Sequence, residues 1–292
     1  MDKKTVIALG YFDGVHIGHR QVILKAKELS KKLGCSLTVL TFKGDLRKAI
    51  TGKSQGVIYT FNERKNLIYS LGADNVYGLS VSKSFLKLGK LAFLNYLNKK
   101  FNVLGYVSGQ DYTFGKNGGN VNFLKEYALK NGQTAISVDP IVVQGEKASS
   151  TNVKKLLENG DIKSANVLLG SDYFISGKIV KDRSVGAKLG FPTANLSYSG
   201  LKFAIKKGVY SGYAILNGKK YLAVINNGSR PTYMEENVAT EAHFINFNGN
   251  LYGKEVRLYF KDYLRDIQKF SNENLLKEKI AEDVFTVQNS ND

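Results

Sequence analysis

The first half of the chain alternates between short apolar runs and stretches with helical spacing. The run at residues 6–9 precedes a stretch whose apolar residues recur at steps of four, three and four and therefore share one helix face: Val22, Ala26, Leu29 and Leu33. Further strand-like runs lie at 37–42, 75–81, 103–107 and 134–138, and helix-like stretches lie at 91–99 and 122–129. This alternation is typical of a parallel sheet covered by helices.

From residue 173 onward, short strands separated by turn residues replace this pattern. The strand-like segments lie at 174–180, 208–216, 221–225, 240–247 and 256–260, and one helix-like segment follows at 273–284. Asn217-Gly218, between two of these segments, favours a tight hairpin. The sequence therefore predicts two domains: an α/β domain at 1–170, and a small antiparallel β-barrel with a C-terminal helix at 171–292.

The charge and cysteine content narrow the function classes. The formal net charge is +17, but the lysines are dispersed and form no long basic block, so small phosphorylated anions are expected as partners in preference to nucleic acid. The single Cys35 excludes disulfides and cysteine-based zinc sites within the chain, and its apolar setting favours a buried thiol over a reactive one. No apolar run has the length of a membrane span, and no signal-peptide core follows the first four residues. We therefore expect a cytoplasmic protein with no membrane contact.

Two histidines mark the start of the first predicted helix. His16 and His19 lie in an H-x-G-H element that follows the first apolar run. Free backbone N–H groups and the helix dipole favour an anion at a helix N-terminus, so this is a candidate phosphate site. Capping of the helix is the plainer alternative for the same residues.

Two further segments of the first half carry candidate chemistry. A glycine-containing loop at 109–115 follows the strand-like run at 103–107, at the sheet edge where α/β proteins bind ligands. Ser149-Ser150-Thr151 precedes a helix-like stretch, and its hydroxyls suit both helix capping and phosphate binding. The residues alone leave these two roles open.

Taken in order, these segments resemble those of bacterial FAD synthetases, through residues 10–19, 109–115 and 149–151. The second half resembles the riboflavin kinase module of the same bifunctional family, through residues 190–196, 208–210, 227–232, 241, 251–253 and 264–265. The resemblance covers nearly the whole chain. It implies a nucleotidyltransferase-type, Rossmann-like α/β domain followed by a riboflavin kinase β-barrel.

The resemblance also implies two consecutive reactions. The C-terminal module would transfer the γ-phosphoryl group of ATP to riboflavin, giving FMN, with Mg²⁺ as cofactor. The N-terminal module would transfer AMP from a second ATP to FMN, giving FAD and pyrophosphate. Phosphoryl transfer asks the protein mainly for positioning and charge stabilisation.

In the first domain, the resemblance implies that His16 and His19 are catalytic and stabilise charge as pyrophosphate leaves. It assigns nucleotide and phosphate binding to a larger set, Gly10, Phe12, Gly14, Gly18, Ser150, Thr151 and Lys154. It places Asp111 and Phe114 in the flavin-binding pocket. A turn position for Asp111 and a core position for Phe114 are the alternatives.

In the second domain, the resemblance implies that Glu241 is the general base for the riboflavin hydroxyl, with an exposed strand carboxylate as the alternative. It assigns nucleotide and phosphate binding to Gly190, Pro192, Thr193 and Asn195, of which Thr193 and Asn195 would also be ligands of Mg²⁺. It assigns flavin binding to Gly208, Tyr210 and Arg265. We expect a structural role for His243.

The chain departs from the family pattern in two places. Lys43-Gly44-Asp45 replaces the usual Pro-His-Pro element, and Lys154 replaces an arginine. Lysine offers phosphate a point charge where arginine offers a planar fork. A riboflavin kinase with a weakened or degenerate adenylyltransferase domain is therefore the alternative function, and a nucleic-acid-binding protein is the alternative of a different class.

Overall fold

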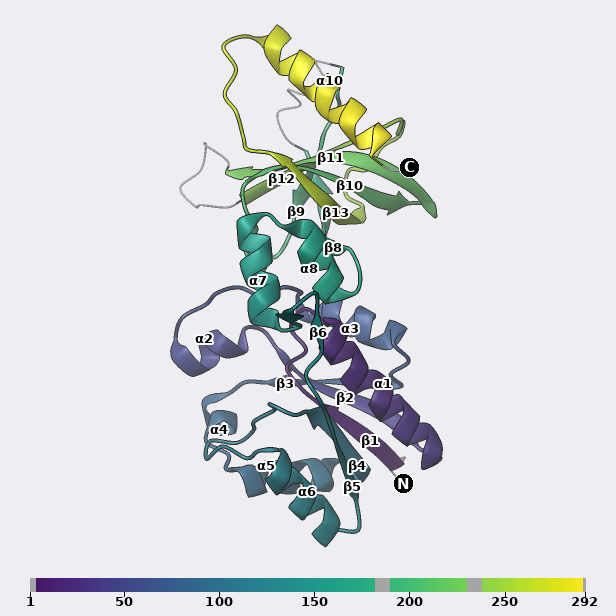
Figure 1. Cartoon of the computed structure of the whole chain (residues 1–292), viewed down its shortest axis with the longest axis vertical. Helices are drawn as coiled ribbons and strands as arrows, with labels where there is room; N and C mark the ends of the chain where they lie inside the picture. The colour runs from purple at the N-terminus through teal and green to yellow at the C-terminus, as the bar shows by residue number, and fades with distance from the viewer. Residues whose placement is uncertain (1–3, 182–189, 230–237, 291–292) are drawn as a thin grey trace. The chain divides into compact units, whose positions relative to one another are not determined.

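The computed structural model describes residues 4–181, 190–229 and 238–290 (Figure 1). The chain divides into two compact units, Met1–Asn152 and Val153–Asp292. Helix α7 (Ser150–Asn159) begins just before this division, and helix α8 (Ile162–Leu169) lies within the second unit. The domain boundary expected near residue 170 stays a prediction. Within the described ranges, none of the helices is long and apolar enough to cross a membrane.

The first unit is built on a parallel sheet with the strand order β3-β2-β1-β4-β5 (Figure 1). The strands are β1 (Lys4–Leu9), β2 (Ser36–Lys43), β3 (Asn75–Ser80), β4 (Asn102–Gly109) and β5 (Thr134–Val138). The predicted α/β sheet is confirmed. The strand order reverses beside β1, and ligands of such sheets bind at the carboxyl ends of the strands at this point.

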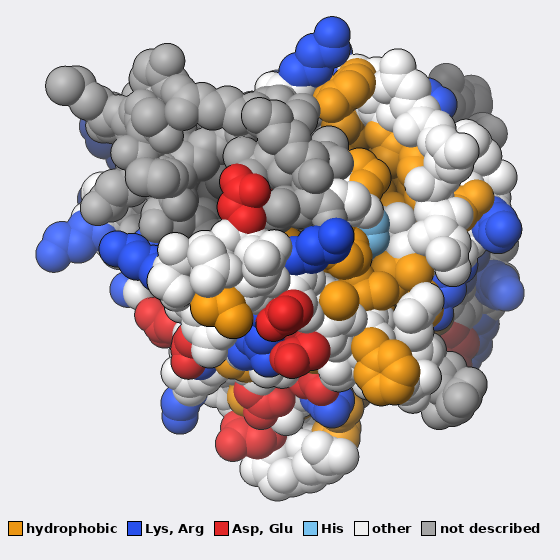
Figure 2. All heavy atoms as spheres, turned by 90° about the horizontal axis from the view of Figure 1, so that it is seen from above, with side chains coloured by type: hydrophobic (Ala, Val, Ile, Leu, Met, Phe, Trp, Pro, Cys, Tyr) orange, Lys and Arg blue, Asp and Glu red, His pale blue; other side chains and the backbone are white. Residues whose placement is uncertain are grey.

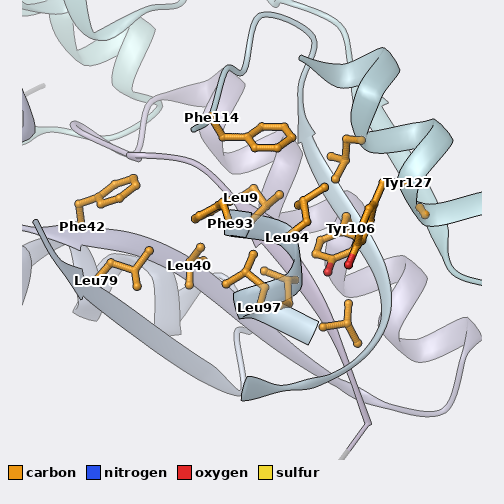
Figure 3. Close-up of a cluster of buried hydrophobic side chains, with 14 residues drawn as sticks. Leu9, Leu40, Phe42, Leu79, Phe93, Leu94, Leu97, Tyr106, Phe114 and Tyr127 are labelled. Carbon is orange, nitrogen blue, oxygen red and sulfur yellow. The ribbon is translucent and has the colours of Figure 1, made fainter. Parts of the chain in front are cut away.

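Both faces of this sheet are buried, which explains why its strands have continuous apolar runs. Val6 and Ala8 of β1 pack in the cluster that contains the buried side of α1 (Ile17–Lys32), whereas Ile7 and Leu9 pack in the opposite cluster. Figure 3 shows this second cluster, to which α5 (Lys90–Lys100) and α6 (Val121–Lys130) contribute. The alternating side chains of one strand therefore hold both helical layers.

The helices of the first unit depart from the sequence-based expectations in two ways. Leu33 was expected to continue the apolar face of α1, but the helix ends at Lys32 and Leu33 is its C-cap, 37% exposed. The structure also contains elements between β2 and β4 that the pattern did not predict: α2 (Leu46–Thr51), α3 (Phe61–Ser70) and α4 (Lys83–Leu86). A short β6–β7 pair (Val142–Val143 and Glu146–Lys147) precedes α7.

The second unit contains a closed antiparallel barrel with the order β10-β11-β12-β9-β8-β13, followed by helix α10 (Glu273–Asn289). Its strands are β8 (Tyr173–Val180), β9 (Ala194–Ser197), β10 (Gly208–Leu216), β11 (Lys219–Ser229), β12 (Val238–Phe244) and β13 (Glu255–Arg265). Asn217 and Gly218 both have positive φ in the β10–β11 turn, as the hairpin prediction requires. The predicted barrel and C-terminal helix are confirmed, whereas the short β9 was not predicted.

Candidate functional site

The first unit contains a pocket of about 300 Å³ at the carboxyl ends of β1, β4 and β5, beside the N-terminus of α1. We call it the histidine pocket. It is lined by residues 9–12, His16, Gly18, His19, Val22, 109–112, 138–141 and 147–150. The fold therefore brings the histidine element, the 109–115 loop and the serine segment to one cavity.

The turn between β1 and α1 has an unusual backbone that presents the two histidines. Phe12, Gly14 and Val15 have φ values of 55°, 86° and 44°, a left-handed region that costs energy for residues with a side chain. A Cβ atom on Gly10 would lie only 2.8 Å from the Phe12 ring, so Gly10 leaves the space that this buried ring needs. Among the predicted nucleotide-binding residues, Gly10, Phe12 and Gly14 thus shape the turn.

His16 and His19 form a stacked pair at the start of α1. His16 is the N-cap, and its Nδ1 accepts a hydrogen bond from the backbone N–H of His19 at 3.4 Å. Their ring centroids are 3.6 Å apart, and both side chains line the histidine pocket. A Cβ atom on Gly18 would lie 3.3 Å from the His16 ring, so glycine keeps this position open. His16 therefore combines helix capping with a place in the cavity.

Burial keeps both imidazoles neutral. Loss of solvent lowers the pKa of His16 to about 4. Burial, followed by the nearby His16 and Arg64, holds the pKa of His19 well below its usual value. Within the described structure, Nδ1 of His19 has no hydrogen-bond partner. The site therefore presents neutral rings, each with one N–H group to donate.

Arg64 of α3 anchors the strand ends behind these histidines, a role that the sequence reasoning missed. It is fully buried, and its guanidinium donates to the backbone oxygens of Tyr11 at 2.7 Å and Phe42 at 2.8 Å. The guanidinium also lies 4.7 Å from the centre of the Tyr11 ring. These contacts tie the ends of β1 and β2 together next to the histidine pocket.

The segment Lys43-Gly44-Asp45, which differs from the family pattern, makes local contacts. The Tyr11 hydroxyl donates to the Gly44 backbone oxygen at 3.0 Å, and the Asp45 carboxylate caps α2 by accepting from the Lys48 N–H at 3.0 Å. The segment is thus bound to a residue that lines the pocket. It is an ordered connection in place of the family's usual element.

The remaining predicted residues of the first site fall into two groups. Ser150 and Asp111 both line the histidine pocket. The Ser150 hydroxyl donates to the Asp13 backbone oxygen at 2.6 Å, and the Asp111 carboxylate forms an ion pair with Lys147. Three others do not line it. Thr151 is exposed on α7. Lys154 belongs to the second unit, where its ammonium group lies 5.6 Å from the centre of the Phe203 ring. Phe114 is buried in the core cluster of Figure 3.

The second unit contains two cavities that meet at Thr193. The Glu241 pocket, of about 220 Å³, is lined by Phe191, Thr193, Val209, Val224, Asn226, Glu241, His243, Arg265, Ile267, Gln268, Phe270, Leu276, Ile280 and Asp283. The Tyr252 pocket, of about 210 Å³, is lined by Ile179, 192–194, Phe244, Phe247 and 249–252. Thr193 lines both cavities.

The strand register places Glu241 beside two asparagines. Glu241 of β12 lies opposite Asn226 of β11 and Asn195 of β9. Asn195 is 6% exposed, and its Oδ1 has no hydrogen-bond partner in the parts of the chain that the structure describes. A buried oxygen without a partner is costly, which makes it a candidate ligand for a cation.

Arg265 lies in the Glu241 pocket, held by the C-terminal helix. Its guanidinium makes a two-pronged ion pair with Asp283 of α10, with a shortest distance of 2.7 Å. Asp283 is mostly buried. The pair fixes α10 against β13 and closes one side of the cavity. Sequence reasoning missed Asp283, because a helix carboxylate usually faces solvent.

The other predicted flavin-binding residues do not line either cavity. Tyr210 is fully buried, packs edge-on against Phe260 and Tyr263, and donates to the Lys206 backbone oxygen. Gly208 is a close-packing position, since a Cβ there would lie 2.4 Å from the Tyr263 ring. Gly190 is exposed with a positive φ, and residues 230–232 of the 227–232 motif lie outside the described residues.

Comparison with known proteins also divides the chain into two parts. Residues 1–152 match the family model described as FAD synthetase, and residues 169–291 match the model described as riboflavin kinase. A bifunctional riboflavin kinase/FMN adenylyltransferase of Bacillus subtilis is 33% identical over 96% of this chain and 90% of its own length. The Escherichia coli protein of that name is 29% identical over 96% of this chain and 91% of its own length.

A solved structure also matches the fold. A protein from Streptococcus pneumoniae, whose structure is described as that of a macrolide-efflux protein, superimposes with a TM-score of 0.89 at 28% identity. The match covers 99% of this chain and 95% of the pneumococcal chain.

Proposed function

The chain belongs to the family of bifunctional riboflavin kinase/FMN adenylyltransferases, and from this premise we propose which residues perform each reaction. The second unit converts riboflavin and ATP to FMN, and the first unit converts FMN and ATP to FAD and pyrophosphate. The observation that carries the assignment is that each unit has its own cavity, lined in one by the histidine pair and in the other by Glu241 and Thr193.

In the histidine pocket the nucleophile is a phosphate oxygen of FMN, which is already ionised. It attacks the α-phosphorus of ATP, and the bond to the bridging oxygen of pyrophosphate breaks. The neutral rings of His16 and His19 donate N–H groups to oxygens on which charge accumulates, as preorganised donors do. A bound anion raises the pKa of both imidazoles. The rings therefore take up a proton more readily as negative charge develops on the leaving pyrophosphate.

In the barrel the nucleophile is the 5′-hydroxyl of riboflavin, which must lose a proton. We place riboflavin in the Glu241 pocket and the ATP phosphates in the Tyr252 pocket, with Thr193 where the two meet. Glu241 accepts the hydroxyl proton as the oxygen attacks the γ-phosphorus and ADP leaves. Arg265 and Asp283 hold the wall of the flavin cavity formed by α10.

Two residues near Glu241 fit Mg²⁺. Thr193 lines both cavities, and Asn195, which lines neither, lies opposite Glu241 with an Oδ1 that has no hydrogen-bond partner among the described residues. Both side chains carry hard oxygen donors, and Mg²⁺ is usually completed by phosphate and water oxygens. In the described ranges no cluster of three or more His, Cys, Asp or Glu is placed to hold a metal ion, so ATP would supply most of the charge. When bound, Mg²⁺ neutralises charge on the transferred phosphate.

The comparisons with known proteins give no support to the degenerate alternative. The 43–45 segment is tied to Tyr11, and both the stacked histidine pair and Ser150 line the histidine pocket, which supports an active first unit. The pneumococcal protein is described as an efflux protein, but likeness of fold does not transfer an activity. We propose that the small molecules ATP, riboflavin and FMN are the partners and that the protein is cytoplasmic, since its single Cys35 fits a reducing compartment.

A product assay tests the proposal. Purified protein is incubated with riboflavin, ATP and Mg²⁺, and the flavins are separated by chromatography over time. We expect FMN to rise first and FAD to follow. FMN that accumulates without FAD, even when FMN is supplied directly, would support the degenerate alternative. Unchanged riboflavin would reject the kinase assignment.

A further inference from the structure

His243 contacts the segment that carries Thr193 and lies beside Glu241. It lies two residues after Glu241 on β12, so both side chains leave the same face of the strand, and both line the Glu241 pocket. Its Nδ1 lies 2.9 Å from the backbone oxygen of Pro192. In the view of Figure 2, hydrophobic side chains gather on one side of the described surface, with histidine atoms exposed among them.

The contact begins where the strand ladder stops. The pairing of β12 with β9 runs from Thr240 opposite Leu196 to Ala242 opposite Ala194. Beyond Ala194 the chain continues backwards through Thr193 to Pro192, which has no backbone N–H for a ladder bond. The His243 side chain supplies the next link between the two segments.

The chemistry of this link fixes the histidine ring. A carbonyl oxygen can only accept, so Nδ1 of His243 carries the hydrogen and donates it. The ring also meets Phe191 edge-on, with centroids 5.4 Å apart and an interplanar angle of 85°. Contacts with two successive residues of the same segment, Phe191 and Pro192, therefore hold one imidazole.

The Pro192 oxygen belongs to the peptide plane that ends at the Thr193 Cα atom, and that plane is rigid. A hydrogen bond to this oxygen fixes the orientation of the plane and thereby limits the orientation of the Thr193 backbone. Thr193 is the residue that lines both cavities. Strand β12 thus carries both Glu241, which faces the riboflavin hydroxyl in our assignment, and His243, whose ring orients Thr193 beside the ATP phosphates.

We propose that His243 is a positioning residue for phosphoryl transfer, which holds the Pro192 carbonyl and thereby fixes Thr193 relative to Glu241. This inference rests on the proposed role of Thr193 in the kinase site. Its effect is on the alignment of the two substrates, and a small misplacement of reacting groups costs up to about 100-fold in rate.

Three variants separate the hydrogen bond from the ring packing. His243→Asn keeps a donor close to the Nδ1 position without the ring, His243→Phe keeps the ring against Phe191 without the donor, and His243→Ala lacks both. We expect kcat for FMN formation to fall about 10- to 100-fold in the Phe and Ala variants, with little change in KM for riboflavin, and to recover to within about threefold of the original in the Asn variant.

FAD formation from supplied FMN is measured in the same preparations, because it belongs to the other unit and should not change. Thermal unfolding and flavin binding confirm that the barrel is intact in each variant. The proposal is overturned if the Phe variant is as active as the original and the Asn variant is as slow as Ala, which would show a packing role. It is also overturned if the loss appears only in KM for riboflavin. Failure of the proposed function would instead appear as no FMN from the unmutated protein.

Discussion

The two units present the side chains that we assign to the two reactions in different ways. In the first unit His16 is buried, His19 is half-buried and both are neutral, at the end of a sheet covered on both faces. Glu241 of the second unit is half-buried on the strand face that lines a cavity with α10. The difference fits the roles that we propose, because the FMN phosphate needs hydrogen-bond donors whereas the riboflavin hydroxyl needs a base.

Removal of the histidine pair should have the largest effect. In His16→Ala/His19→Ala, FAD formation should fall about 10⁴-fold, since each lost preorganised donor costs about 10²–10³. FMN should still accumulate from riboflavin at the original rate. The measurement is a time course of all three flavins. Loss of FMN formation in the folded double variant would break the comparison, because it would make the histidines part of the kinase.

Glu241→Gln tests the other half of the comparison. The amide keeps size and polarity but cannot accept the hydroxyl proton, so FMN formation should fall about 10²–10⁴-fold. Conversion of supplied FMN to FAD should continue, and riboflavin should still bind. If the variant phosphorylates riboflavin at close to the original rate, Glu241 is only a strand carboxylate.

Substitutions of Arg64 test how the first unit is stabilised. Arg64→Met removes a charged donor from the buried oxygens of Tyr11 and Phe42 and should destabilise the first unit by about 3 kcal/mol. Arg64→Lys, which keeps one charged donor, should lose less. Hydrogen exchange of peptides from residues 4–152, with peptides from the barrel as the control, measures the change. Equal protection in the Met variant and the original would show that these bonds do not hold the unit together.

The pH dependence of stability should differ between the units. The folded pKa of His16 is about 4 and its unfolded value is about 6.5, so only the unfolded chain takes up this proton between those values. Through His16 the first unit should therefore lose about 3 kcal/mol as the pH falls from 6.5 to 4, and the lowered pKa of His19 adds to this loss. Hydrogen exchange at several pH values tests this. The double alanine variant should show a shallower fall, and an identical slope would contradict the buried neutral pair.

The sequence predicted those elements of the fold that have a strong apolar or turn pattern. The β1 run, buried on both faces, and the hairpin at Asn217-Gly218 gave strong signals, and both elements are present. The short α2 and β9 gave none. Leu33 continues the helical spacing, but the helix ends before it, because spacing does not encode where a helix stops.

The candidate sites show a similar limit. The histidine element and Glu241 were found from motif resemblance, and the structure places them in cavities. Arg64 and Asp283 were missed, since a charged residue on a helix gives no sign in the sequence that it is buried and paired across the fold. Phe114 and Tyr210 lie in motifs but pack in cores, because an aromatic residue suits a pocket wall and a core equally well.

The central claim is that each unit carries one complete reaction, and mixing two variants tests it most directly. Glu241→Gln alone and His16→Ala/His19→Ala alone should both fail to make FAD from riboflavin, ATP and Mg²⁺. Mixed together they should make it, because FMN released by the histidine variant reaches the intact histidine pocket of the other. A mixture that makes no FAD, either because the histidine variant forms no FMN or because Glu241→Gln does not convert supplied FMN, would show that the two reactions do not act independently.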